Sequence, residues 1–95
     1  MIMRILKYPL QIVDSQTLLI PHHSDARLLA VQDGVLCLWL EVRDDWAKRP
    51  HTLRLVGTGH DISDLMNYEH VGSVVMPPFV WHAYLSEQPL PAEKQ

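Results

Sequence analysis

The sequence predicts an all-β fold, mainly antiparallel, built as a small sandwich or barrel of about seven short strands with at most one short helical turn. Short runs recur along the chain in which apolar and polar residues alternate, or in which β-branched residues are frequent. Prolines, glycines and polar clusters separate these runs. No stretch keeps the longer period of an amphipathic helix, so an all-β architecture is favoured.

Length and composition indicate one small domain. The 95 residues are 47% hydrophobic, which is ordinary for a folded chain. A chain of this size buries roughly two-thirds of its unfolded surface, which is enough for a modest core. We expect the domain to span residues 1–85. Pro89 and Pro91 stand among polar residues in 86–95, which predicts an extended or disordered tail there.

Two short strands are predicted in the first part of the chain. Ile2–Tyr8 alternates with the period of a strand and ends at Pro9, because proline cannot donate a hydrogen bond to a neighbouring strand. Gln16–Ile20 is apolar enough for a second strand, and Pro21 closes it. A polar connector, residues 22–25, then leads into the next pair of strands.

The hairpin at Arg27–Val42 is the centre of the predicted fold. Its two apolar runs flank Asp33-Gly34, a pair that favours a type I′ turn with positive φ at both residues. A two-residue loop sets the facing pairs as Gln32–Val35, Val31–Leu36, Leu29–Leu38 and Arg27–Leu40. One face then carries Val31, Leu36, Leu29, Leu38 and Leu40, and the other carries Ala30, Cys37, Leu28, Trp39 and Val35. Because both faces are apolar, a second layer or a partner must cover each of them.

Beyond the hairpin, the sequence predicts a loop, a strand and a turn. Arg43–Pro50 is the most hydrophilic stretch and is predicted to be a solvated loop. His51–Val56 resumes the alternation of a strand, which Gly57-Thr58-Gly59 breaks. Asp61–Leu65 favours a single helical turn capped by the Asp61 side chain.

Two further strands complete the predicted sheet structure. Glu69–Met76 contains Gly72, which indicates a bulge or a close approach of another backbone. Pro77-Pro78 provides a turn, and Val80–Leu85 is the last predicted strand.

Charge, hydropathy and cysteine content exclude several classes of protein. The net charge of -3 argues against a nucleic-acid binder, which needs a basic face. The longest apolar run, Val35–Leu40, is too short to span a membrane. Arg4 and Lys7 interrupt the apolar N-terminus, which therefore does not resemble a signal peptide. We expect a cytoplasmic protein without nucleic-acid or membrane partners, in which Cys37 is an inert buried thiol.

The six histidines are candidate metal ligands, because imidazole is the commonest ligand for metals in proteins. None has the local spacing of a metal motif. If the fold brings His51, His60 and His82 together, three imidazoles could hold zinc or iron with an open position for water. The alternative is that these histidines are scattered and hydrogen-bonded, and no cofactor is needed.

The segment from Pro77 to His82, preceded by Gly72, resembles the second half-motif of cupins, whose barrels hold a metal through histidines. The resemblance implies a metal or small-ligand protein that uses His60 and His82. Phe79 stands where that motif has glycine, and no upstream HxH with a following glutamate supplies the remaining ligands.

Trp46 is the main candidate for contact with another protein, because it lies in a charged loop where aromatic residues are unusual. Its neighbours Asp45, Lys48 and Arg49 complete the predicted partner-binding group. The alternative is that Trp46 folds back and caps the core. No serine or cysteine has an evident base and orienting group near it in the sequence, so we predict no catalytic residue and no enzyme.

Taken whole, the chain resembles a family of small phage and prophage proteins carried as a domain of unknown function. The resemblance rests on Lys7-Tyr8-Pro9-Leu10, Asp14 with Gln16-Thr17, Ile20-Pro21, Val31-Gln32, Leu36-Cys37-Leu38-Trp39, Arg54, Gly57-Thr58-Gly59-His60, Tyr68 through Gly72, and Val80-Trp81-His82. It implies the product of a phage accessory gene that acts in the bacterial cytoplasm. Such proteins often bind and block host proteins, including CRISPR and other defence components.

These observations predict a non-catalytic protein-binding module. We expect a homodimer that docks on a host or phage protein, as an anti-CRISPR-like inhibitor of host defence does. The alternatives are the cupin-like metal or ligand protein and a minor component of the phage particle.

Overall fold

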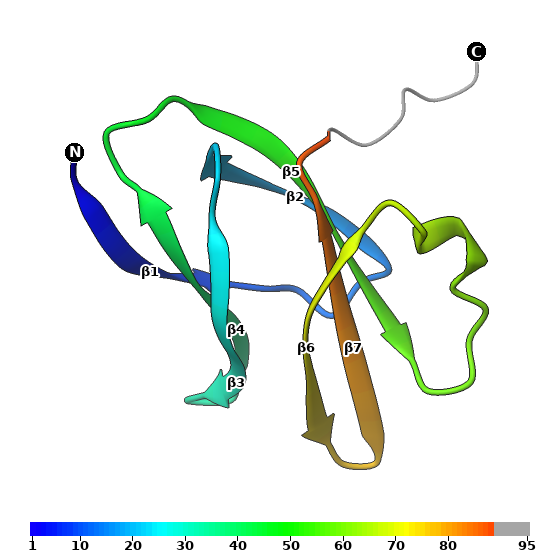
Figure 1. Cartoon of the computed structure of the whole chain (residues 1–95). Coiled ribbons are helices and arrows are strands. Elements are labelled where there is room, and N and C mark those ends of the chain that lie inside the picture. The colour runs from blue at the N-terminus through cyan, green and yellow to red at the C-terminus, as the bar shows by residue number, and fades with distance from the viewer. Residues whose placement is uncertain (89–95) are drawn as a thin grey trace.

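The computed structural model describes residues 1–88, and within them seven strands form two antiparallel sheets (Figure 1). The strands are β1 (Met3–Pro9), β2 (Ser15–Pro21), β3 (Asp25–Gln32), β4 (Val35–Arg43), β5 (Lys48–Gly57), β6 (Glu69–Met76) and β7 (Phe79–Ser86). The three-stranded sheet has the order β1-β4-β3, and the four-stranded sheet has the order β2-β5-β7-β6. The predicted all-β class is confirmed, as an open two-sheet sandwich in these residues and not as a closed barrel.

One hydrophobic core joins the inner faces of the two sheets, because side chains alternate between the faces of a strand. Strand β4 contributes its even-numbered residues, and β5 contributes Leu53 and Leu55. The core residues are Leu10, Ile20, Leu29, Leu36, Leu38, Leu40, Val42, Leu53, Leu55, Ala83 and Leu85. The single helical element, the 3-10 turn η1 (Ser63–Leu65), lies in the connection between β5 and β6.

The central hairpin forms as predicted up to its last pair. Asp33 and Gly34 have φ of 52° and 79°, as a type I′ turn requires. Leu29 faces Leu38 as expected, but the predicted pairing of Arg27 with Leu40 is wrong. The register shifts at Arg27, so that Ala26 faces Leu40 instead. A bulge inserts one extra residue into one strand, and nothing in the two-residue turn specifies it.

Strand β5 begins earlier than predicted, at Lys48 within the expected solvated loop. Lys48 pairs with Pro21 of β2, and Pro50 pairs with Leu19. Strand β7 begins to pair with β5 only at Thr52, so Pro50 lies where β5 has a partner on one side only. Proline is tolerated at such edge positions because its missing N–H need not donate to a second neighbour.

The bulge predicted at Gly72 is present, and the side chain of Leu29 in β3 lies close beside it. The register of β6 and β7 shifts between His70 and Gly72, and Gly72 has a φ of +156°. A Cβ atom placed on Gly72 would lie 2.7 Å from the Cβ atom of Leu29 in β3. Gly72 therefore lets the edge of the four-stranded sheet lie against the edge of the three-stranded sheet.

The predicted tail begins in ordered structure. Ser86 is the last residue of β7, and the Thr52 hydroxyl donates a hydrogen bond of 2.7 Å to the carbonyl oxygen of Gln88. Residues 89–95 of the predicted tail lie outside the described residues. In the described part of the chain, no helix is long and apolar enough to cross a membrane.

Candidate functional site

The outward side of the three-stranded sheet is largely apolar and exposed. Its exposed side chains are Ile5 (58%), Leu28 (52%), Met3 (49%) and Val35 (43%), and the half-buried Trp39 lies between them. Trp39 pairs with Lys7 of β1 on one side and with Leu28 of β3 on the other. We call these five apolar residues the open face. Cys37 lies on the same side of β4 but is buried, as predicted for an inert thiol.

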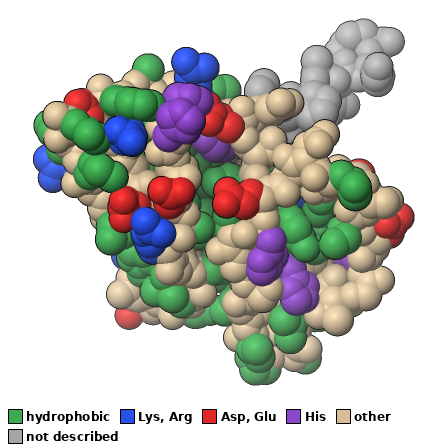
Figure 2. Space-filling view, viewed as in Figure 1, with side chains coloured by type: hydrophobic (Ala, Val, Ile, Leu, Met, Phe, Trp, Pro, Cys, Tyr) green, Lys and Arg blue, Asp and Glu red, His purple; other side chains and the backbone are tan. Residues whose placement is uncertain are grey.

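Polar and charged groups surround the open face. The Lys7 ammonium donates a hydrogen bond of 2.9 Å to the side-chain oxygen of Gln32. Arg27 forms an ion pair of 3.1 Å with Glu41. Figure 2 shows this mixture on the side of the molecule formed by the three-stranded sheet, where hydrophobic side chains stand among Lys, Arg, Asp and Glu. An apolar centre with a polar rim is the usual anatomy of a protein interface.

Trp46 lies in the β4–β5 loop, and 37% of the residue is exposed. Its ring stacks on His22 at 5.9 Å between ring centroids and meets the edge of His23 at 5.6 Å. The guanidinium carbon of Arg43 lies 4.6 Å from the centre of the Trp46 ring. Trp46 is not part of the hydrophobic core formed by the described residues. The ring is therefore held by polar neighbours and keeps one part on the surface.

The other predicted partner-binding residues are exposed beside Trp46. The Asp45 carboxylate accepts a hydrogen bond of 3.2 Å from the backbone N–H of Ile2, which lowers the pKa of Asp45. Lys48 and Arg49 are exposed at the start of β5. One carboxylate and two cations are thus exposed within three residues of Trp46 in the chain.

A hollow of about 360 Å³ connects the rim of the open face with the neighbours of Trp46. Met3, Glu41 and Arg43 line it from the three-stranded sheet, and His23 lines it from the connector that contacts Trp46. We call Trp46 with Asp45, Lys48 and Arg49 the Trp46 end. The open face and the Trp46 end therefore adjoin each other.

Glu87 adds a carboxylate near the same end of the molecule. Partial burial raises the pKa of Glu87, but a hydrogen bond with His22 and the charges of His22, His51 and Arg49 outweigh that effect and lower it. Glu87, Glu69, His23 and His51 line a hollow of about 200 Å³. The Glu87 side chain is therefore an ionised carboxylate at neutral pH.

The structure separates His51 from His60 and His82, the other two candidate metal ligands. His51 is buried on the inner side of β5, opposite Leu18, whereas His82 pairs with Val56 on the outer side. His60 and His82 line one hollow of about 220 Å³, which His51 does not reach. Among residues 1–88, no group of three His, Cys, Asp or Glu side chains is arranged to hold a metal ion.

His82 instead lies in a chain of four polar side chains that the sequence did not reveal. Its Nε2 atom lies 2.9 Å from the Thr58 hydroxyl, and its Nδ1 atom lies 2.7 Å from the Ser73 hydroxyl. The Ser73 hydroxyl also lies 3.0 Å from Nε2 of His70. The signal that would have found the central contact is the Pro77-Pro78 turn. Counting outward from it pairs Ser73 with His82, as the structure shows.

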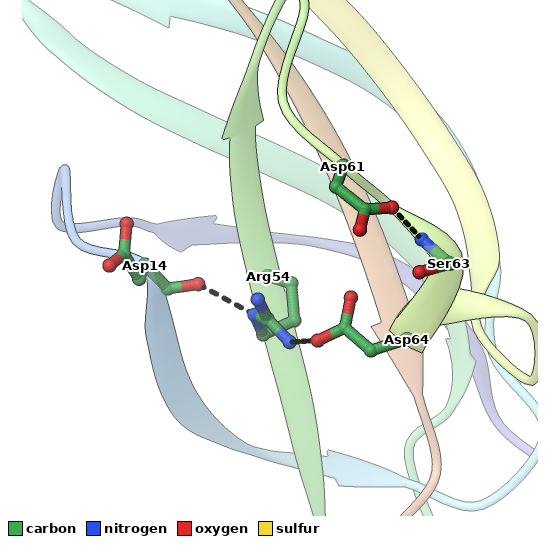
Figure 3. A network of polar contacts seen from close by, with 5 residues as sticks. All are labelled: Asp14, Arg54, Asp61, Ser63 and Asp64. Carbon is green, nitrogen blue, oxygen red and sulfur yellow. Dashed lines mark hydrogen bonds and ion pairs between the residues drawn. The ribbon is translucent and has the colours of Figure 1, made fainter.

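A second polar network fixes the segment that carries Thr58 and His60 (Figure 3). Arg54 on β5 donates hydrogen bonds of 3.1 Å to the carbonyl oxygen of Asp14 and to the carboxylate of Asp64. The Asp61 carboxylate accepts a hydrogen bond of 2.9 Å from the N–H of Ser63, which lowers the pKa of Asp61. The β5–β6 connection is thus tied to the outer side of the four-stranded sheet.

Comparison with known proteins gives one match. The family model for a domain of unknown function, DUF7352, matches residues 1–94. No curated protein and no solved structure matches the sequence. The predicted resemblance is confirmed in one respect, namely that the chain matches a family of unknown function. Because the match spans nearly the whole chain, the protein belongs to the DUF7352 family.

Proposed function

We propose that the protein is a protein-binding module that contacts other chains through the open face and the Trp46 end. The observation that carries this proposal is the exposed apolar side of the central hairpin. The four-stranded sheet covers one apolar side of that hairpin, and the other side stays in contact with solvent in residues 1–88. Exposed apolar patches rimmed by polar residues mark interaction sites in soluble proteins.

A second copy of the chain is the proposed cover for the open face. A two-fold interface must be complementary to itself, so each charge on its rim needs an opposite charge on the same rim. The rim carries charges of both signs. Lys7, Arg27 and Arg43 are positive, and Asp25 and Glu41 are negative. Burial of the apolar centre favours the free energy of association by about 25 cal/mol for each Å² of apolar surface that the second copy removes from water.

The Trp46 end is the proposed contact with a different protein. Tryptophan and arginine are enriched among the residues that dominate binding energy, because they bury large areas with little loss of side-chain entropy. Trp46 is already held by His22, His23 and Arg43, so less motion is lost when a partner covers it.

The proposed biological context rests on the family resemblance of the sequence alone. In this proposal the protein is a small phage or prophage accessory protein that acts in the bacterial cytoplasm. Its partner in this proposal is a host protein, and binding inhibits a host defence system as anti-CRISPR proteins do.

Truncation of Trp46 tests the contact with the partner. After the partner has been captured from host lysate and purified, we expect Trp46→Ala to weaken its affinity about 30-fold or more, because hot-spot truncations cost at least about 2 kcal/mol. The melting temperature of the isolated protein should stay nearly unchanged. Titration calorimetry and thermal unfolding measure the two quantities.

Phe79→Ala is the matched control for Trp46→Ala. Phe79 is an aromatic residue that is 56% exposed at the β6–β7 turn, away from the Trp46 end, so its truncation should leave the affinity unchanged. The proposal fails if Trp46→Ala binds as tightly as the natural protein. It also fails if Trp46→Ala loses several kcal/mol of stability, because Trp46 would then act as a core residue.

A further inference from the structure

We propose that Thr58, with His82 as its general base, forms an acyl-transfer site that hydrolyses small neutral carboxylic esters. The site lies on the outer side of the four-stranded sheet, on the opposite sheet from the open face. It does not depend on the proposed protein-binding role.

The chain of four side chains has the arrangement of an activated nucleophile. A nucleophile needs a base within hydrogen-bond reach, and the base needs a third group that orients it. The Thr58 hydroxyl lies 2.9 Å from Nε2 of His82, and the Ser73 hydroxyl lies 2.7 Å from Nδ1 on the opposite side of the ring. Thr58 is the nucleophile in this arrangement, His82 is the base and Ser73 is the positioning residue.

The hydrogen bonds are consistent with one direction of proton donation along the whole chain. A neutral imidazole carries one N–H donor and one acceptor nitrogen. If Thr58 donates to Nε2 of His82, then Nδ1–H of His82 donates to Ser73, and Ser73 donates to Nε2 of His70 at 3.0 Å. Each of the three contacts then has one donor and one acceptor, and His82 is ready to accept the Thr58 proton.

His60 supplies a donor in the hollow that Thr58 and His82 line. Its Nδ1 atom accepts a hydrogen bond of 3.3 Å from the N–H of Gly57, so the neutral ring carries its proton on Nε2. The ring lies against Gly57, where an added Cβ atom would be 3.4 Å from Cε1 of His60. Thr58, His60 and His82 line the same hollow of about 220 Å³, so the Nε2–H group of His60 can stabilise negative charge there.

The size and charge of the hollow select the substrate. Its volume of about 220 Å³ is smaller than that of most drug-sized ligand sites, so a small acyl group fits best. Val56 and Ile62 give it an apolar wall, and Tyr84 also lines it. The carboxylate of Asp61, next to His60 in the chain, disfavours an anionic substrate.

The reaction balances with water as the only co-reactant. The Thr58 oxygen attacks the ester carbonyl carbon while its proton moves to Nε2 of His82, and the Nε2–H group of His60 donates to the carbonyl oxygen. The carbon–oxygen bond to the alcohol then breaks, and the alcohol takes the proton from His82. Water attacks the threonyl ester through the same base, which releases the carboxylic acid and restores Thr58.

Hydrolysis of p-nitrophenyl acetate tests this site. We expect Thr58→Val, which removes the hydroxyl group and keeps the shape, to lower kcat/KM about 100-fold, and Thr58→Ser to stay within about 10-fold of the natural protein. Rapid quenching followed by peptide mass spectrometry should find the acetyl group on Thr58. Thr17→Val is the matched control, because it makes the same change at an exposed threonine of β2 that does not line the hollow, and it should leave the rate unchanged.

Two results would overturn the proposal. One is a rate for Thr58→Val that equals that of the natural protein, and the other is an acetyl group found only on histidine nitrogens. Ser73 has its own test, because a positioning residue should act on the chemical step. We expect Ser73→Ala to lower kcat about 10-fold at unchanged KM and Ser73→Thr to restore it, and an effect on KM alone would contradict this role.

Discussion

Replacing Leu38 with alanine is expected to lower the free energy of unfolding by about 2–5 kcal/mol, because the change removes three buried carbons and leaves a cavity. Leu38 is fully buried in the middle of β4, the central strand of its sheet. It faces Tyr8 of β1 and Leu29 of β3 and packs on the inner side of the sandwich. Urea denaturation followed by tryptophan fluorescence measures the loss.

Leu19→Ala is the control that makes the same chemical change on the surface. Leu19 is 61% exposed on the outer side of β2, so its truncation should cost less than about 1 kcal/mol. Equal losses for Leu38→Ala and Leu19→Ala would contradict the arrangement of the two sheets, because Leu38 could not then be at the centre of the core.

Gly72→Ala is expected to destabilise the protein by about 2–5 kcal/mol, from backbone strain and from a clash between the sheets. The added Cβ atom would lie 2.7 Å from the Cβ atom of Leu29, and a Cβ atom cannot rotate away as the end of a flexible side chain can. β6 and β3 would have to separate to make room. Thermal and urea unfolding of the variant measure the cost.

Gly34→Ala separates the strain of positive φ from the clash. Gly34 has a φ of +79°, and apart from its two chain neighbours no residue of the described chain has an atom within 4 Å of a Cβ atom placed there. This variant should cost only the backbone strain, about 1–2 kcal/mol. If Gly72→Ala costs no more than Gly34→Ala, the close approach of β3 and β6 is not part of the folded state.

Local signals were sufficient to predict most of the strands. The Asp33-Gly34 pair specified the turn and the register near it, because φ preference and loop length act within a few residues. The bulge at Arg27 was not predicted, since it depends on how the far end of β3 meets β4. The early start of β5 was missed for a similar reason. Lys48–Pro50 is hydrophilic, and only pairing with β2 makes it a strand.

The candidate sites were less predictable because they depend on which strands lie side by side. Alternation along β5 could have placed His51 on the inner side of the sheet. The side on which His82 lies could be predicted only with knowledge of how β5 pairs with β7. The contact of Ser73 with His82 required the pairing of β6 with β7. Trp46 was singled out from its charged surroundings alone, whereas its contacts with His22 and His23 depend on the proximity of two loops.

The most direct test of the proposed binding role is sedimentation equilibrium of the natural protein and of Leu28→Glu. Leu28 is 52% exposed on the open face, so the added carboxylate should leave the isolated chain folded, as circular dichroism can check. If a second copy covers the open face, the natural protein sediments as a dimer. Leu28→Glu then sediments as a folded monomer, because an unpaired charge buried in an apolar interface is strongly unfavourable. A natural protein that is monomeric at every concentration, or a Leu28→Glu variant that remains dimeric, would contradict the account.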